Sequence, residues 1–249
     1  MTLVRNLKLA GMALALGGIL TACSSDDDGA KNTNEGQLKI KSTASYSGET
    51  ARNANAVVLS SFMVNFKEIE LEYAEEDSNG VDLYFDSEDE VELRGPFEVD
   101  LLAQNSVSLA TVNVPNGVYE EVEFEFDKSE DSNSALFGKS MQLEGSINGT
   151  PFVFWHDFDE EIEVDYENQG TNLVIDGNSS ELVINFDLDA VVGINGLVDL
   201  SIATDLDGDG TITISPEDQD GNQALAAALK SAIKAQIELM DDMYDDDED

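Results

Sequence analysis

The sequence predicts an all-β protein: an antiparallel β-sandwich, Ig-like or prealbumin-like, followed by one C-terminal amphipathic helix. Three observations support this prediction. From Gln37 to about Thr204, apolar and polar residues alternate with a period of two, turn residues interrupt the alternation roughly every ten residues, and helical periodicity begins only after Asp220. Many short strands without intervening helices are typical of a sandwich.

The alternation is clearest in two segments, residues 62–73 and 118–127. Their apolar rows, which we expect to face the core, are Val64, Phe66, Ile69 and Leu71 in the first and Val122, Phe124 and Phe126 in the second. The other expected strands are residues 38–44, 81–85, 97–102, 107–114, 141–147, 151–158, 162–166, 172–175, 182–188 and 198–203. Asn-Gly pairs at 79–80, 116–117 and 148–149 supply the positive φ angles that tight hairpin turns require.

A helix is expected after Asp220, where apolar residues recur at helical spacing. The members of this apolar stripe are Leu225, Leu229, Ile233, Ile237 and Met240. The stripe should pack on the sandwich. The acidic run that follows would place negative charge at the negative end of the helix dipole, so the last turn should fray.

The first 22 residues have the pattern of a secretory leader. A basic start with Arg5 and Lys8 precedes an apolar stretch, residues 9–20, that is shorter than the about 20 residues a membrane span requires. The segment Leu20-Thr21-Ala22-Cys23 resembles the lipobox of bacterial lipoproteins. This resemblance implies that Cys23 is acylated and begins the mature chain, with outer-membrane lipid as its permanent partner. The alternative is a buried free cysteine.

An acidic tether is expected between the anchor and the domain. Residues 23–36 contain Ser24-Ser25-Asp26-Asp27-Asp28 and too few apolar side chains to offset the entropy cost of ordering. The run resembles the short signal that sends Bacteroidota lipoproteins to the outer face of the outer membrane, which implies exposure at the cell surface. The alternative is an ordinary linker in a protein that faces the periplasm. The predicted organisation is therefore a leader (1–22), a tether (23–36) and one domain (37–245).

Charge and cysteine content restrict the partners. Cys23 is the only cysteine, so the domain has no internal disulfide and no cysteine-based metal site. Removal of the leader takes away Arg5 and Lys8 and leaves 10 basic residues against 53 acidic ones, a net charge of −43. A field of that sign repels nucleic acid and anionic lipid headgroups and attracts cations or basic surfaces. The simplest explanation is solubility in a salty or calcium-rich medium.

The most specific local motif is the acidic segment Asp205-Leu206-Asp207-Gly208-Asp209-Gly210-Thr211-Ile212. It resembles the calcium loops of EF-hands and dockerin modules, in which alternate carboxylates converge on a hard cation. We therefore expect a Ca²⁺ cofactor. The expected ligands are Asp205, Asp207, Asp209, the Thr211 carbonyl and Glu217.

The motif departs from an EF-hand in two respects. Position twelve is Pro216 in place of the usual glutamate, and Glu217 or Asp218 would have to substitute. The residues before the loop, 197–203, have the pattern of a strand where an EF-hand has its first helix. We expect a calcium loop outside the EF-hand fold, and the alternative is an acidic turn that binds nothing.

Other acids form rows along two expected strands. The rows are Glu121, Glu123, Glu125 and Asp127 on one strand and Asp159, Glu161, Glu163 and Asp165 on another. Like charges directly opposite one another on paired strands destabilise a sheet. The rows should therefore face solvent apart from each other or share cations. Two of these carboxylates could lie at glycosidase spacing, but so many acids make that coincidence uninformative.

The sequence indicates no catalytic set. His156 is the only histidine, which excludes a His-rich zinc site, and nothing nearby supports a Ser-His-Asp triad. The chain has no Gly-x-Ser-x-Gly elbow, no phosphate-binding Gly-rich loop and no His-Glu-x-x-His helix. His156 and Trp155 are expected to be structural, with Trp155 as a sugar contact the lesser alternative. We therefore predict no catalytic residue and no enzyme.

Two longer stretches, residues 97–102 (FEVDLL) and 109–119 (LATVNVPNGVY), accompany the lipobox and the late Asp-rich loop. Together these features resemble uncharacterised β-sandwich lipoproteins, common in Bacteroidota, that carry a domain of unknown function. The resemblance covers most of the mature chain. It implies the fold and the cellular location, and it supplies no catalytic residues.

The resulting hypothesis is a non-catalytic binding or adhesion module at the cell surface, anchored through Cys23 and stabilised by calcium. Its partner would be a polysaccharide or a surface protein, and not nucleic acid. Two alternatives remain. One is a carboxylate-based hydrolase of surface polysaccharide, and the other is a structural or assembly subunit of a surface appendage.

Overall fold

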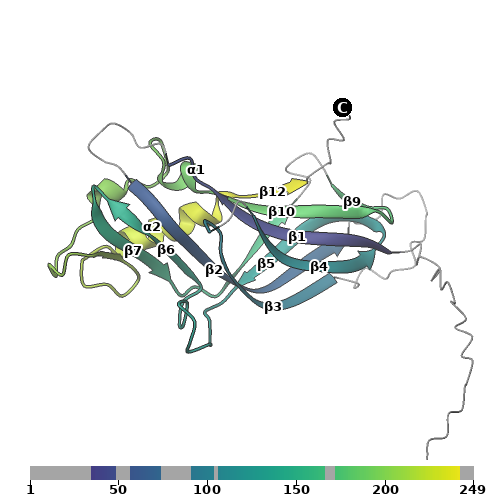
Figure 1. Ribbon diagram of the computed structural model, residues 1–249, viewed down its shortest axis with the longest axis horizontal. Coiled ribbons are helices and arrows are strands. Elements are labelled where there is room, and N and C mark those ends of the chain that lie inside the picture. Colours follow the sequence, from purple (N-terminus) through teal and green to yellow (C-terminus); the bar gives the residue numbers. More distant parts are fainter. Residues whose placement is uncertain (1–34, 49–56, 74–90, 104–105, 166–171, 242–249) are drawn as a thin grey trace, which may run out of the picture. The chain divides into compact units, whose positions relative to one another are not determined.

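The computed structural model describes residues 35–48, 57–73, 91–103, 106–165 and 172–241 (Figure 1). All of the described elements belong to one compact unit, Thr33–Asp249. The predicted all-β, sandwich-like fold is confirmed. In the described part of the chain, no helix has the length and apolar character to cross a membrane.

The fold consists of two sheets. The four-stranded sheet has the order β12-β10-β1-β4, and its strands are β1 (Glu35–Ser45), β4 (Val107–Pro115), β10 (Ser179–Asp187) and β12 (Ile237–Asp241). The larger sheet has the order β11-β7-β6-β2-β5-β8, and its strands are β2 (Val57–Tyr73), β5 (Gly117–Phe126), β6 (Met141–Ile147), β7 (Thr150–His156), β8 (Glu160–Asp165) and β11 (Ile212–Ile214). Outside this path, β3 (Val91–Asp100) pairs with β2, and β9 (Leu173–Ile175) pairs with β5. The helices are α1 (Leu188–Val192) and α2 (Gln223–Lys234).

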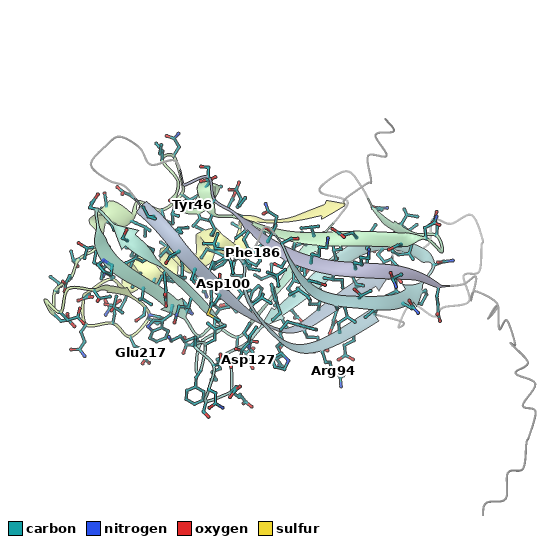
Figure 2. All side chains as sticks on the ribbon, in the orientation of Figure 1. Tyr46, Arg94, Asp100, Asp127, Phe186 and Glu217 are labelled. Carbon is teal, nitrogen blue, oxygen red and sulfur yellow. The ribbon has the colours of Figure 1, made fainter. Side chains whose placement is uncertain are left out.

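The core contains aromatic residues from both sheets. Phe186 of β10, labelled in Figure 2, makes an edge-to-face contact with Phe62 of β2 at a centroid distance of 5.4 Å. Its ring also lies 6.2 Å from that of Phe66 and 6.4 Å from that of Phe126. The apolar rows predicted for residues 62–73 and 118–127 are fully buried, which confirms the direction in which those strands face.

Strand β2 changes phase in its middle. Phe66 and Ile69 are both buried although they lie three residues apart, which strict alternation forbids. The pairing of β2 with β3 and with β5 shifts between Phe66 and Glu68, so a β-bulge lies at Lys67. The extra residue returns the second half of the strand to the core face.

The expectation of a purely antiparallel sandwich is wrong for two strand pairs. β1 pairs with β10 in parallel over Gln37 to Ser45, and β7 pairs with β11 in parallel over Phe152 to Phe154. The partners in each pair are far apart in the sequence. Hairpin turn signals therefore do not govern these pairs, and tertiary packing selects their direction.

The C-terminal region differs from its prediction. Helix α2 ends at Lys234, and the last two members of the expected helical stripe, Ile237 and Met240, lie in strand β12. β12 pairs with β10, with Leu239 opposite Ile184. The buried strand β10 needs a partner at this edge, and that requirement outweighs the weak helical pattern.

Three shorter segments were not predicted correctly. The strand expected at residues 198–203 is a 3₁₀ turn, Leu200–Ile202, whose N-terminus is capped by Asp199 through a hydrogen bond from the Ser201 N–H. Helix α1 and strand β11 had no clear signal because each contains only a few residues. The leader, residues 23–34 of the tether and the strand expected at 81–85 lie outside the described residues. Glu35 and Gly36, which were expected to end the tether, are the first residues of β1 and pair with β4.

Candidate metal centre

The acidic motif lies in the segment between the 3₁₀ turn and α2, and two anchors hold this segment. Strand β11 fixes its middle to β7. Buried Asn222 joins its two ends, because Asn222 Nδ2 donates to the carbonyls of Thr204 at 2.8 Å and Thr213 at 2.7 Å. Asn222 Oδ1 also accepts the Thr204 N–H at 3.0 Å. The carboxylates therefore project from a fixed frame.

Three carboxylates converge in this frame. Asp205, Asp207 and Asp220 each offer a carboxylate oxygen, and these oxygens lie within 4.8 Å of one another. Ca²⁺ binds oxygens at about 2.3 to 2.6 Å, so two ligands on one ion lie at most about 5 Å apart. The spacing fits a calcium ion, and the donor set is made of the hard oxygens that this ion prefers.

The loop is shaped by hydrogen bonds from its own backbone. Asp205 accepts the N–H of Gly208 through Oδ1 at 2.8 Å and the N–H of Gly210 through Oδ2 at 3.1 Å. Both glycines have positive φ, +74° and +91°, which a residue with a Cβ adopts only with strain. Asp209 Oδ1 accepts the Thr211 N–H at 2.8 Å. These bonds turn the chain around the position where the carboxylates meet.

Asp220 is the member of the three-carboxylate group that the sequence prediction missed. Its side chain is 1% exposed, and it accepts the N–H of Asp207 through Oδ1 at 3.2 Å and that of Thr213 through Oδ2 at 2.7 Å. The EF-hand pattern predicts the last carboxylate ligand at position twelve. Here β11 follows the loop, so the chain returns to the carboxylates only at Asp220. The available signal was a second pair of alternate acids, Asp218 and Asp220, directly before the helix.

Two other expected ligands, Asp209 and Glu217, are not members of the three-carboxylate group. Asp209 bonds to Thr211 as described. Glu217, labelled in Figure 2, is exposed, and its N–H donates to Ser215 Oγ at 3.3 Å. Asp218 caps the turn instead, because its Oδ1 accepts the N–H groups of Gly221 at 2.8 Å and Asn222 at 3.0 Å. The third carboxylate of the group is thus Asp220, and not a residue at or next to position twelve.

Mutual repulsion is visible at Asp207. The N–H of Asp209 acts to lower the pKa of Asp207, but desolvation and the charges of Asp209, Asp220 and Asp205 act in the other direction. The net effect raises the pKa of Asp207 above its usual value. A divalent cation between these groups would remove this repulsion.

A second acidic surface covers the outer face of the larger sheet, and we call it the acidic grid. Carboxylates of β2, β5 and β8 stand directly opposite one another in two rows, Glu68, Glu125 and Glu161 in the first and Glu70, Glu123 and Glu163 in the second. Of the two expected alternatives, rows that lie apart are excluded, because β5 and β8 are neighbours, and shared cations stay a prediction. Two groups of three lie close enough to share a cation: Glu72, Glu121 and Glu123, and Glu68, Glu70 and Glu92.

Protonation is favoured in the centre of the grid. Burial raises the pKa of Glu121 to about 7, with further contributions from Glu163, Glu72 and Glu123. Basic residues offset part of this charge at the margin of the grid. Lys67 Nζ lies 2.6 Å from Glu125, and Arg94, labelled in Figure 2, pairs with Glu92 and with Glu68.

His156 and Trp155 have structural contacts. The His156 ring packs edge-on against Phe158 at 5.4 Å, and its Nδ1 accepts the Asp157 N–H at 3.0 Å. Burial, then the charge of Lys230, lowers the pKa of His156. Trp155 is half-buried, and the Lys139 ammonium lies 5.9 Å from its ring centroid.

Comparison with known proteins gives one match. The model of a protein family described as a domain of unknown function (DUF4382) matches residues 54–199, more than half of the chain. No curated protein and no solved structure matches. The matched region ends before Asp205, so the three-carboxylate group, α2 and β12 all lie beyond it.

Proposed function

The chain belongs to the DUF4382 family, whose description assigns no activity, and from its own residues we propose a non-catalytic binding or adhesion module that is stabilised by calcium and anchored at the cell surface. The observation that supports the calcium part is the convergence of Asp205, Asp207 and Asp220. The proposals of a lipid anchor and of a location at the cell surface depend on the sequence of residues 1–36.

Calcium would act on stability, because its ligands come from both ends of one segment. Asp205 and Asp207 precede β11, whereas Asp220 lies between β11 and α2. Two like charges about 4 Å apart repel by about 1 kcal/mol in bulk water and by about 4 kcal/mol at an effective dielectric constant of 20. An ion would convert this repulsion into attraction and fix the start of α2 relative to β11.

The calcium part is tested by calorimetric titration of the protein with Ca²⁺ and by melting curves in calcium and in EDTA. We expect a saturable heat of binding and a higher melting temperature in millimolar calcium. Absence of both would contradict a calcium site.

The anchor is tested separately. Lipidation at Cys23 predicts incorporation of labelled palmitate that Cys23→Ser abolishes. Surface exposure predicts that protease added to intact cells degrades the protein. Protection of the protein while the outer membrane is intact would reject exposure and favour the periplasmic face.

One observation favours a second candidate, an assembly subunit of a surface appendage. β12 is both the last described strand and an edge strand, and its pairing with β10 is the kind of contact that a strand from another chain can replace. Removal of residues 237–249 followed by addition of a synthetic peptide of the same sequence tests this candidate. Rebinding of the peptide would support strand exchange, and failure to rebind would count against it.

A further inference from the structure

A polar cluster lies beneath the loop between β5 and β6. β5 ends with Phe126 opposite Phe66, and β6 begins with Met141 opposite Val64. β3 occupies one edge of β2, so β5 and β6 lie one after the other along the opposite edge. Residues 127–140 connect β5 to β6 and leave the sheet at the gap between them. Asn65 of β2 stands at this gap.

Asn65 ties both ends of the loop to β2. Its backbone N–H donates to the Ser140 carbonyl at 2.9 Å, and its Nδ2 donates to the Asp127 carbonyl at 2.7 Å. Figure 2 labels Asp127 where the loop leaves the sheet. A reversed amide would place Oδ1 against a carbonyl oxygen, so these contacts fix the orientation of the side chain.

The Asn65 side-chain oxygen is buried without a partner. Asn65 is 3% exposed, and among the described residues Oδ1 has no hydrogen-bond donor within reach. Buried acceptors are nearly always satisfied by the protein, by water or by an ion. Because Nδ2 faces Asp127 on the β5 side, Oδ1 is turned toward the loop and toward β3.

Further oxygen ligands lie on that side. Glu98 of β3 is the cross-strand partner of Asn65, so the two side chains share the outer face of the sheet. The Glu98 carboxylate accepts hydrogen bonds from the hydroxyls of Ser129 and Ser134, which the loop brings across β2. Both hydroxyl protons are thereby used, and each hydroxyl oxygen also accepts a backbone N–H of the loop, so one lone pair is left on each. The loop thus covers an amide oxygen, a carboxylate and two hydroxyl oxygens.

We propose that this cluster is a second cation site, for Ca²⁺, with Asn65 Oδ1 and Glu98 as its ligands. Calcium takes mixed sets of carboxylate, amide and water oxygens. It would satisfy the orphaned Oδ1, neutralise Glu98 and pin the loop of residues 127–140 to the sheet. The proposal does not rest on the Asp205 centre.

The test uses the full chain with Asp205→Asn and Asp207→Asn, which removes the first centre. Tb³⁺ serves as the calcium probe, and Trp155, the only tryptophan, sensitises its emission. Lys139 of the loop contacts the Trp155 ring, so an ion under the loop lies near the sensitiser. We expect saturable emission that excess Ca²⁺ displaces.

Variants separate the site from other acids. Glu98→Gln should weaken Tb³⁺ binding by about tenfold or more. Glu144→Gln, on the same face of β6 but outside the cluster, is the matched control and should retain the affinity. Asn65→Asp keeps the shape and adds a charge, so it should tighten binding and make the melting temperature depend more strongly on calcium.

Two results would overturn the proposal. One is the absence of sensitised emission. The other is emission that neither Glu98→Gln nor Asn65→Asp alters. Either result would mean that the cluster of Asn65 and Glu98 does not hold a cation. Because the first centre is disabled throughout, failure here leaves the titration of the unmodified protein as an independent test of the proposed function.

Discussion

The side chain of Asp220 accepts the backbone N–H of Asp207 at 3.2 Å, across thirteen residues of chain. The bond closes the acidic segment into a loop whose two ends carry carboxylates. It also gives Asp220 a role that its neighbours Glu217 and Asp218 do not have. The first prediction follows from this difference.

Asp220→Asn should weaken calcium binding by about tenfold or more, because it removes one of three charged ligands while preserving the size of the side chain. Isothermal titration calorimetry measures the affinity. Glu217→Gln is the matched control, since it removes the same charge from an exposed position in the same segment. Equal losses in both variants would indicate a general effect of charge and not a ligand role for Asp220.

Glu121→Gln should stabilise the protein at pH 8 by a few tenths of a kcal/mol to about 1 kcal/mol, because it removes a charge from the crowded acidic grid. Unfolding by urea at low salt measures this gain. Glu130→Gln, in an exposed position of the β5–β6 loop, should have little effect. A destabilised Glu121→Gln variant would show that the charged carboxylate is needed, as it would be for a bound cation.

Stability should fall as the pH rises from about 4.5 to above 7. The pKa of Glu121 is about 7 in the folded protein and 4.5 ordinarily, so the folded state holds this proton more tightly. The stabilising contribution is therefore complete below the lower value and is lost as the pH passes the higher one. Melting temperatures across this range should show a smaller decline in Glu121→Gln than in the unmodified protein. Parallel curves would contradict the assignment.

Glu160→Gln should destabilise the packing of α2 against β8 by about 1 kcal/mol. Glu160 accepts hydrogen bonds from both Lys230, at 2.5 Å, and Lys234, one helical turn later, and these two bonds lower its pKa. This contribution is present above the ordinary pKa of 4.5 and is lost as the pH falls through the depressed value. Urea unfolding at pH 7 should show the loss, and the exposed neighbour variant Glu161→Gln should not.

Phe186→Ala should cost about 3 to 5 kcal/mol of unfolding free energy, because the ring is 1% exposed and packs against aromatic residues of the opposite sheet. Chemical denaturation measures the loss. Phe137→Ala removes the same side chain from a position that is 56% exposed and should change stability by less than about 0.5 kcal/mol. Similar costs at both positions would contradict the location of the core.

The alternation of apolar and polar residues predicted the strands that bury one face. The apolar rows of β2 and β5 alternate because one face of each strand is buried, and that alternation can be read directly in the sequence. β12 could not be found in this way. Ile237 fits the apolar stripe of α2 as well as the pattern of a strand, and only the open edge of β10 decides between them.

The candidate metal centre was predicted in part for a similar reason. Asp205 and Asp207 lie in a contiguous motif whose spacing has a known chemical meaning. Asp220 joins them only because β11 and Asn222 return the chain to the loop. The opposition of acids in the grid likewise depends on β5 and β8 being neighbours, which their separate sequences do not reveal.

The position of β11 and β12 has a consequence for self-association. β11 covers the outer edge of β7 in one sheet, and β12 covers the outer edge of β10 in the other. Both lie beyond the residues that match the family. A chain that ended at residue 199 would lack both strands and would expose unpaired backbone amides and carbonyls along β7 and β10, which are templates for aggregation. The C-terminal segment therefore replaces the edges of β7 and β10 with shorter edge strands of three and five residues, which offer a neighbouring copy less backbone to pair with.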